Sequence, residues 1–216
     1  MTDKAEFLAA LRGAATGGER ITRRPFADVP VPPPVVPRRR DTETTLRESW
    51  SRAFTLLGGH VHDATRDGVA DAVAGALDGR GPVLVDDASV GFGADQAGGR
   101  LLRWPACGLD VAATATCGVV RATAAIAATG SIVVDSSRAG RLVSLLPPVA
   151  VFVIDVASIV ELTGDVLRRH PAWWPDGPPT NVVLVTGPSR SGDIEMILAV
   201  GVHGPGEVHP VLVDDA

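Results

Sequence analysis

The sequence predicts one α/β domain built around a buried, mostly parallel β-sheet. Three observations lead to this fold class: short runs that are apolar throughout, segments of helical periodicity that alternate with them, and glycine or proline between the two kinds of segment. The chain has 216 residues, of which 45% are hydrophobic, and this is enough for a single domain with a sizeable core. We place this domain at residues 41–216.

The first forty residues predict a short helix followed by an extended arm. Phe7, Leu8 and Leu11 would share one face of a helix over residues 3–12. Residues 23–40 contain six prolines, which exclude helix and central strand and favour a polyproline-like conformation. The arm is either a linker on the domain surface or a clasp between the subunits of a homo-oligomer.

Two amphipathic helices are predicted next. The first follows capping-type residues at 42–45 and ends at Gly58-Gly59. Its apolar face would consist of Leu46, Trp50, Ala53, Phe54 and Leu57. The second runs from about Arg66 to Leu77 and is again followed by glycine.

Six short apolar runs have the composition of strands. They lie at 82–87, 100–105, 131–136, 149–155, 181–187 and 208–215, and a glycine loop at 90–93 follows the first of them. Three more helices are expected: over part of the alanine-rich stretch 114–128, over 157–170 and over 193–201. Strands that are apolar on both faces and alternate with helices indicate a sheet covered by helices.

Composition excludes several classes of protein. A net charge of -5 and a pI near 5.5 argue against nucleic-acid binding, which needs a basic surplus. No apolar run is long enough for a membrane span, and the first twenty residues lack the apolar stretch of a secretory signal, so we expect a cytoplasmic protein. Two cysteines without a C-x-x-C pair cannot hold a four-cysteine iron–sulfur cluster. The single lysine, Lys4, argues against Walker and Schiff-base chemistry.

The best candidate ligand site is the loop that joins the run at 181–187 to the helix expected at 193–201. Ligands of open α/β sheets bind beyond the carboxyl ends of strands, where loops lead into helix N-termini. The glycines, hydroxyls and guanidinium of this loop suit a carboxylate or phosphate. The predicted ligand-binding residues, including a second glycine-bearing turn, are Thr129, Gly130, Thr186, Gly187, Ser189, Arg190, Ser191, Asp193 and Glu195. The alternative is purely local: a cap at Ser191 or Gly192, and acids that complement the helix dipole.

Histidines offer weaker candidates. His203 lies in a glycine- and proline-rich turn that could present it as a proton carrier, and it is the candidate catalytic residue; a bond to the backbone is the alternative. His60 and His62 would share a face of an extended segment, but a metal would need a third ligand, so we predict no metal and a polar sheet edge. His209 is expected to be structural.

Two segments of the second half resemble a known family. Residues 186–215, TGPSRSGDIEMILAVGVHGPGEVHPVLVDD, are similar to the terminal signature of the LUD, or lactate-utilisation, domain. AAIAATGSIVVDSS at 124–137, with the LVSLLPPVAVFVI that follows, is similar to its middle signature. The resemblance covers the chain from about residue 110 onward. The short length and the missing cysteine motifs point to the lactate utilization protein C branch.

This resemblance implies a three-layer α/β/α fold with a mostly parallel sheet, NagB/RpiA/CoA-transferase-like. It also implies a cytoplasmic role in a bacterial system that oxidises L-lactate to pyruvate beside iron–sulfur proteins, with no cofactor on this chain. Family members usually read A-E-T-G where this chain has Ala127-Ala128-Thr129-Gly130. If that glutamate carries an acid–base role in the family, Ala128 removes it here.

Three functions remain open at this point. The first is a non-redox component of a lactate-oxidising system that binds a small anionic metabolite. The second is a stand-alone isomerase or transferase acting on a sugar phosphate or a CoA ester, which the relatives of the fold favour. The third is a non-catalytic anion-binding module, which the scarcity of lysine and the absence of tyrosine favour.

Overall fold

The computed structural model describes residues 44–93, 100–136, 141–169, 172, 174, 175, 177, 179–191, 199–201 and 203–214. All of them belong to one compact unit, Pro37–Ala216. The helix expected at 3–12, the proline-rich arm and the predicted site residues Asp193 and Glu195 lie outside the described residues, so these remain predictions.

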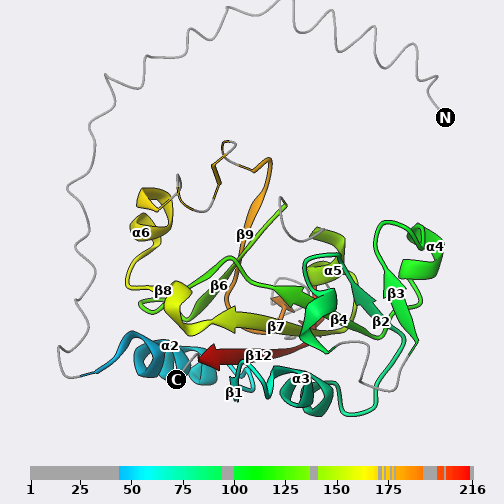
Figure 1. Cartoon of the computed structure of the whole chain (residues 1–216), viewed down its shortest axis with the longest axis horizontal. Helices are drawn as coiled ribbons and strands as arrows, with labels where there is room; N and C mark the ends of the chain where they lie inside the picture. Colours follow the sequence, from blue (N-terminus) through cyan, green and yellow to red (C-terminus); the bar gives the residue numbers. More distant parts are fainter. Residues whose placement is uncertain are drawn as a thin grey trace, which may run out of the picture. The chain divides into compact units, whose positions relative to one another are not determined.

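The described residues contain a central sheet of six strands, all paired in parallel (Figure 1). Its order is β1-β12-β7-β4-β2-β3. The strands are β1 (His62–Thr65), β12 (Glu207–Asp214), β7 (Val149–Asp155), β4 (Cys117–Arg121), β2 (Val83–Val85) and β3 (Leu101–Arg103). Every side chain of β2 is buried, as its uniformly apolar sequence predicts.

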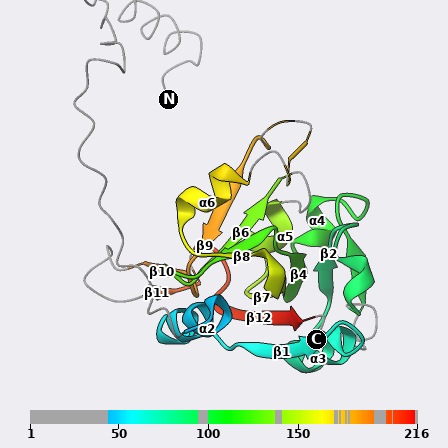
Figure 2. The ribbon, with the colours of Figure 1, turned by 60° about the vertical axis from the view of Figure 1, so that its left-hand side comes forward.

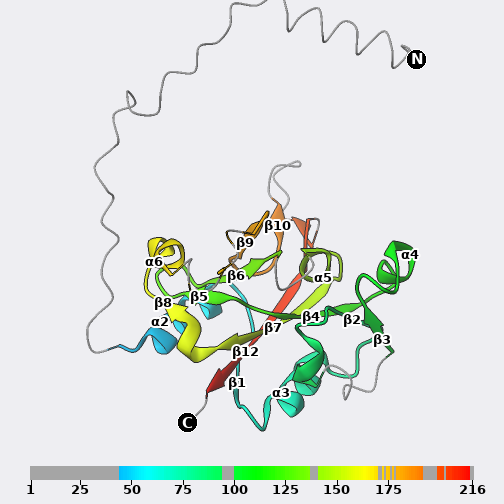
Figure 3. The same ribbon diagram turned by 45° about the horizontal axis from the view of Figure 1, so that its top comes forward.

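The central sheet is covered on both faces (Figure 3). On one face, α3 (Val69–Leu77) buries Val73 and Leu77 against alternate valines of the strands. On the other face lie α2 (Leu46–Leu56), α4 (Leu109–Ala112), α5 (Arg141–Leu145) and a second sheet. The α/β class with a mostly parallel sheet is therefore confirmed, and one outer layer is partly a sheet.

The second sheet has four strands in the order β8-β5-β6-β9. They are β8 (Ile159–Val160), β5 (Ala124–Ile126), β6 (Ser131–Asp135) and β9 (Val182–Val185). Its outer face packs against α6 (Thr163–Arg168) and Trp174, whose indole N–H donates to Asp135 at 3.0 Å.

Helix α2 forms where the sequence places it. Thr45 and Glu48 make a capping box, in which the Thr45 hydroxyl accepts from the Glu48 N–H and the Glu48 carboxylate accepts from the Thr45 N–H. Trp50 and Phe54 are fully buried and stack with ring centroids 4.9 Å apart. Gly58, at a φ of +87°, ends the helix. The second predicted helix is confirmed as α3, although it begins at Val69 instead of Arg66.

The helix expected within 114–128 is wrong. That stretch forms β4 and β5. A Cβ on Gly118 would lie 2.3 Å from the carbonyl oxygen of Val143, so α5 approaches β4 too closely for any larger residue. The small residues therefore serve close packing, and burial overrides the helical propensity of alanine.

Three other expectations are corrected. Residues 157–170 are not one helix: the 3-10 helix η3 (Val156–Ser158) and β8 precede the short α6. The run at 181–187 is an edge strand and not a buried one, because Val182 and Leu184 of β9 are 42% and 46% exposed. The end of the helix expected at 193–201 is a strand, β11 (Ala199–Val200), which pairs with β10 (Arg190–Ser191).

Candidate functional site

The predicted ligand loop lies at the amino edge of the central sheet, where β7 and β12 begin. The Ser189 N–H donates to the carbonyl of Pro205 at 2.8 Å, and the Gly206 N–H donates to that of Pro148 at 2.9 Å. Both prolines lie just before a central strand. The loop follows the carboxyl end of β9, as predicted, but β9 belongs to the second sheet. The expectation that the loop lies at the carboxyl edge of the main parallel sheet is therefore wrong.

The structure brings together the two glycine-bearing segments that the sequence singled out. The hydroxyls of Thr129 and Ser131 are 2.7 Å apart, and those of Ser131 and Thr186 are 2.9 Å apart. The indole N–H of Trp50 donates to the carbonyl of Ser131 at 3.1 Å, so α2 anchors the row. Ser131 belongs to the glycine-bearing turn that the sequence indicated, but it was not among the predicted ligand-binding residues. The neighbouring Thr129-Gly130 was a signal for it, but no pattern showed which hydroxyl would be central.

Gly130 and Gly187 have a packing role at this place. Their φ angles are +64° and +86°, which disfavour any residue with a Cβ. A Cβ on Gly130 would lie 2.9 Å from the Phe54 nitrogen, and one on Gly187 would lie 2.9 Å from the Leu57 Cβ. Both glycines therefore let the second sheet and its loop approach α2.

Arg190 also contacts α2. Figure 2 shows β10 (Arg190–Ser191), the strand that contains it, close to α2. Its Nη2 donates to the carbonyl of Leu57 at 2.9 Å, and Leu57 is the C-terminal cap of the helix. A cation at a helix C-terminus is electrostatically favourable. Arg190 lies in β10 and not at a helix N-terminus, and its side chain is exposed.

The remaining predicted residues lie around this place. Ser191 follows Arg190 in β10, and His203 is exposed in the turn that precedes β12. A Cβ on Gly204 would lie 3.5 Å from the Ser189 Cβ, so that turn contacts the loop. We call the group Thr129, Gly130, Ser131, Thr186, Gly187, Ser189 and Arg190 the amino-edge site.

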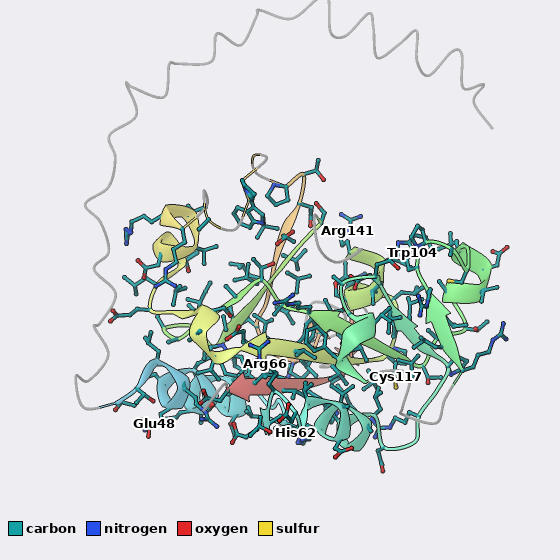
Figure 4. The ribbon with its side chains drawn as sticks, in the orientation of Figure 1. Glu48, His62, Arg66, Trp104, Cys117 and Arg141 are labelled. Carbon is teal, nitrogen blue, oxygen red and sulfur yellow. The ribbon has the colours of Figure 1, made fainter. Side chains whose placement is uncertain are left out.

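A different set of residues meets at the opposite, carboxyl edge of the sheet. A cavity of about 130 Å³ lies there, on the α3 face. Its lining residues are Arg66, Val69, Phe92, Arg121, Val153, Asp155 and Val213. Arg66, labelled in Figure 4, follows β1, while Arg121 and Asp155 are the last residues of β4 and β7. We call this group the carboxyl-edge cavity.

Sequence reasoning missed most of this cavity. The sequence predicts the strand that ends at Asp155 and the glycine loop that contains Phe92. The end of a strand at Arg121 was not predicted, because the alanine-rich stretch around it predicts a helix in part. Residues that follow predicted strands are the signal that could have found the cavity.

The cavity wall around Arg121 is held by buried hydrogen bonds. The Arg121 N–H donates to the Ser89 hydroxyl at 3.0 Å, and that hydroxyl donates to a carboxylate oxygen of Asp86 at 2.6 Å. Ser89 is fully buried. The Arg121 guanidinium carbon lies 5.6 Å from the centre of the Phe92 ring, within the range of a cation–π contact. These contacts hold the backbone of Arg121 and place its guanidinium near the Phe92 ring.

The sequence-predicted histidines gather on the α3 face. The Nε2 of His62 is 3.2 Å from the Nδ1 of His209, and the His60 ring stacks on His209 at 5.2 Å. Glu207 is 3.5 Å from the other nitrogen of His209. Burial lowers the pKa of both His62 and His209. No cluster of three or more His, Cys, Asp or Glu side chains among the described residues could hold a metal ion.

Two further observations concern the wider surface. A larger cavity of about 440 Å³ lies beside α4 and β3, the outer strand of the central sheet. It is separate from the carboxyl-edge cavity. None of the helices in the described part of the chain is long and apolar enough to cross a membrane.

Comparison with known proteins places this geometry in context. The family model for the LUD domain matches residues 109–213. Lactate utilization protein C of Macrococcus caseolyticus is 32% identical, over 81% of this chain and 80% of that protein. The protein of the same name from Bacillus subtilis is 38% identical, over 47% of this chain and 43% of that protein.

A solved structure shows the same fold. The crystal structure of a DUF162 family protein from Deinococcus radiodurans matches with a TM-score of 0.59 at 19% identity. The match covers 78% of this chain and 96% of that chain. At this identity it bears on the fold alone.

Proposed function

Because this chain belongs to the LUD-domain family of lactate utilization proteins, we propose that it acts in L-lactate utilisation as a non-redox component that binds a small anionic ligand. Its relatives carry the name lactate utilization protein C. The chain has two cysteines, too few for a four-cysteine iron–sulfur cluster. Electrons from lactate would therefore pass through iron–sulfur partner proteins.

The observation that carries the ligand part of the proposal is that the row of hydroxyls and Arg190 both contact α2, at Trp50 and at Leu57. Thr129, Ser131 and Thr186 are linked at 2.7 and 2.9 Å, and both threonines are exposed at the surface. A guanidinium has five N–H donors, so Arg190 can bind the Leu57 carbonyl and still face an oxyanion. Hydroxyls and a planar fork are suitable partners for a carboxylate.

Substitution of Arg190 tests the amino-edge site. The Kd of the full chain for L-lactate, pyruvate and inorganic phosphate is measured by calorimetry with Arg190→Lys and Arg190→Ala. Lysine keeps the charge without the fork, so we expect a moderate loss for Arg190→Lys and about a tenfold to hundredfold loss for Arg190→Ala. Arg168→Ala, which removes an exposed arginine of α6, is the matched control.

The melting temperature of the same variants separates binding from structure. Arg190→Ala also removes the bond to the Leu57 carbonyl, worth about 0.5–1.5 kcal/mol, so a modest loss of stability is expected. Unchanged affinity together with that modest loss would leave Arg190 a helix cap and would refute its place in a ligand site.

A genetic experiment tests the cellular role. Deletion of the gene in its own bacterium should abolish growth on L-lactate as the sole carbon source, and growth on glucose serves as the control. Restoration by the wild-type chain and failure of Arg190→Ala to restore growth would connect the role to the site. Normal growth of the deletion strain on lactate would rule the role out.

A further inference from the structure

The carboxyl-edge cavity has the position of a ligand site. The chain runs from β2 outward to β3 and then returns to β4 on the other side of β2, so the strand order reverses between β2 and β4. Ligands of open α/β sheets bind beyond the carboxyl ends of strands at such a reversal. Arg121 ends β4, and Phe92 lies in η2 (Val90–Phe92), which follows β2.

The size of the cavity restricts the ligand. Pockets for cofactor-sized and drug-sized molecules have volumes of about 300–1,000 Å³. The cavity here, of about 130 Å³, lies below that range. It therefore suits a molecule with only a few non-hydrogen atoms better than a nucleotide or a CoA ester.

The lining chemistry restricts the ligand further. Arg121 supplies a planar guanidinium held by Phe92, and Arg66 adds a second guanidinium to the wall. Asp155 supplies a carboxylate, which is oriented because it accepts the Ala157 N–H at 2.9 Å. The apolar part of the wall consists of Val69, Val153 and Val213. A ligand that satisfies all three parts has a carboxylate, a hydroxyl donor and a short alkyl group.

We propose that this cavity is a second ligand site, separate from the amino-edge site, and that it binds a short α-hydroxy carboxylate. The ligand carboxylate pairs with the Arg121 fork, its hydroxyl donates to Asp155, and its alkyl group contacts the valines. An α-keto acid has no hydroxyl to donate, so the same site discriminates against it. L-lactate belongs to this class, and only its choice as the first probe rests on the proposed function.

The test compares three probes on the full chain. Calorimetry measures the Kd of L-lactate, of pyruvate, which has a ketone in place of the hydroxyl, and of propionate, which has hydrogen there. We expect L-lactate to bind at least about tenfold more tightly than either, because each of the others leaves Asp155 without its donor. Equal affinity for the three would overturn the hydroxy-acid assignment.

Substitutions of residues that line the cavity show whether L-lactate binds there. Arg121→Ala should weaken L-lactate at least about tenfold, and Arg121→Lys, which keeps the charge and most of the volume, should weaken it less. Asp155→Asn keeps an acceptor for the Ala157 N–H, so it should fold normally and reduce the preference for L-lactate over pyruvate. Arg103→Ala is the matched control, since Arg103 ends β3, which β2 separates from β4, and is also exposed.

The outcomes separate this site from the amino-edge site. Loss of L-lactate binding in both Arg121 variants, with normal binding in Arg103→Ala, supports the second site, whether or not Arg190→Ala also weakens binding. Loss in Arg190→Ala with normal binding in both Arg121 variants overturns it and leaves the proposed function intact. Absence of any L-lactate binding to the wild-type chain also overturns it, whereas the growth experiment is independent of this result.

Discussion

The two edges of the central sheet are built in opposite ways. At the amino edge, polar groups bond to one another and to α2: three hydroxyls form a row, and Arg190 binds the Leu57 carbonyl. At the carboxyl edge, side chains from four separate strand ends surround a cavity of about 130 Å³. The segments that resemble family signatures meet at the amino edge, while the carboxyl edge contains a cavity. Short, motif-rich segments can thus reflect close packing, and a pocket can be assembled from residues that share no motif.

Gly130 gives the largest expected effect and tests whether the amino edge is held by packing. In Gly130→Ala, the left-handed φ costs about 1–2 kcal/mol and the crowding against Phe54 about 1–3 kcal/mol, so we expect a loss of about 2–5 kcal/mol in the free energy of unfolding. Urea denaturation measures it.

Gly75→Ala is the matched control. Gly75 lies inside α3, and an added Cβ there meets no atom within 4 Å. It should gain about 0.5–1 kcal/mol, the usual preference for alanine over glycine in a helix. Equal changes in the free energy of unfolding for Gly130→Ala and Gly75→Ala would show that α2 does not pack tightly against the Gly130 turn.

Two serines sharpen the comparison of the edges. Ser89→Ala removes the hydroxyl that donates to the buried Asp86 and accepts from the Arg121 N–H, so we expect a loss of about 1–3 kcal/mol. Ser131→Ala should cost less, under about 1 kcal/mol, because the partner hydroxyls of Thr129 and Thr186 are exposed and water can replace the lost bonds. Urea denaturation of both variants measures the difference, and the reverse order would contradict this view of the two edges.

The histidine pair gives the smallest expected effect, a pH dependence. The pKa of a histidine in the unfolded chain is about 6.5, and burial lowers the pKa of His62 and His209 in the folded chain. Below that pH the unfolded chain therefore binds more protons than the folded chain does. The contribution of the two histidines to the free energy of unfolding is complete above that pH and is lost as the pH falls.

The measurement is urea unfolding in steps from about pH 7.5 to about pH 5.5, above the range in which carboxylates titrate. His62→Gln should reduce the loss of stability at low pH, and His203→Gln, at an exposed turn, should behave as the wild-type chain does. A His62→Gln chain with unchanged pH dependence would remove the pair as its source.

Much of the fold followed from local signals, and the errors share one cause. The capping box at Thr45 and the mostly apolar strands β2, β6 and β7 were predicted correctly because each signal lies within one segment. The alanines of β5 wrongly predicted a helix, because alanine has a high helix propensity and its small side chain also suits close sheet packing. Thr129 and Thr186 were predicted to share a site, and the structure links them through Ser131.

By itself the sequence determined which segments are apolar, where α2 begins and ends, and which cofactor chemistry two cysteines and one lysine cannot support. Only the tertiary structure decided that β9 belongs to the second sheet, so that the predicted loop lies at the amino edge. It also decided that Arg121 and Asp155 line one cavity. The physical reason is that a short apolar run specifies burial but not its neighbours, since strand order and direction depend on contacts between distant segments.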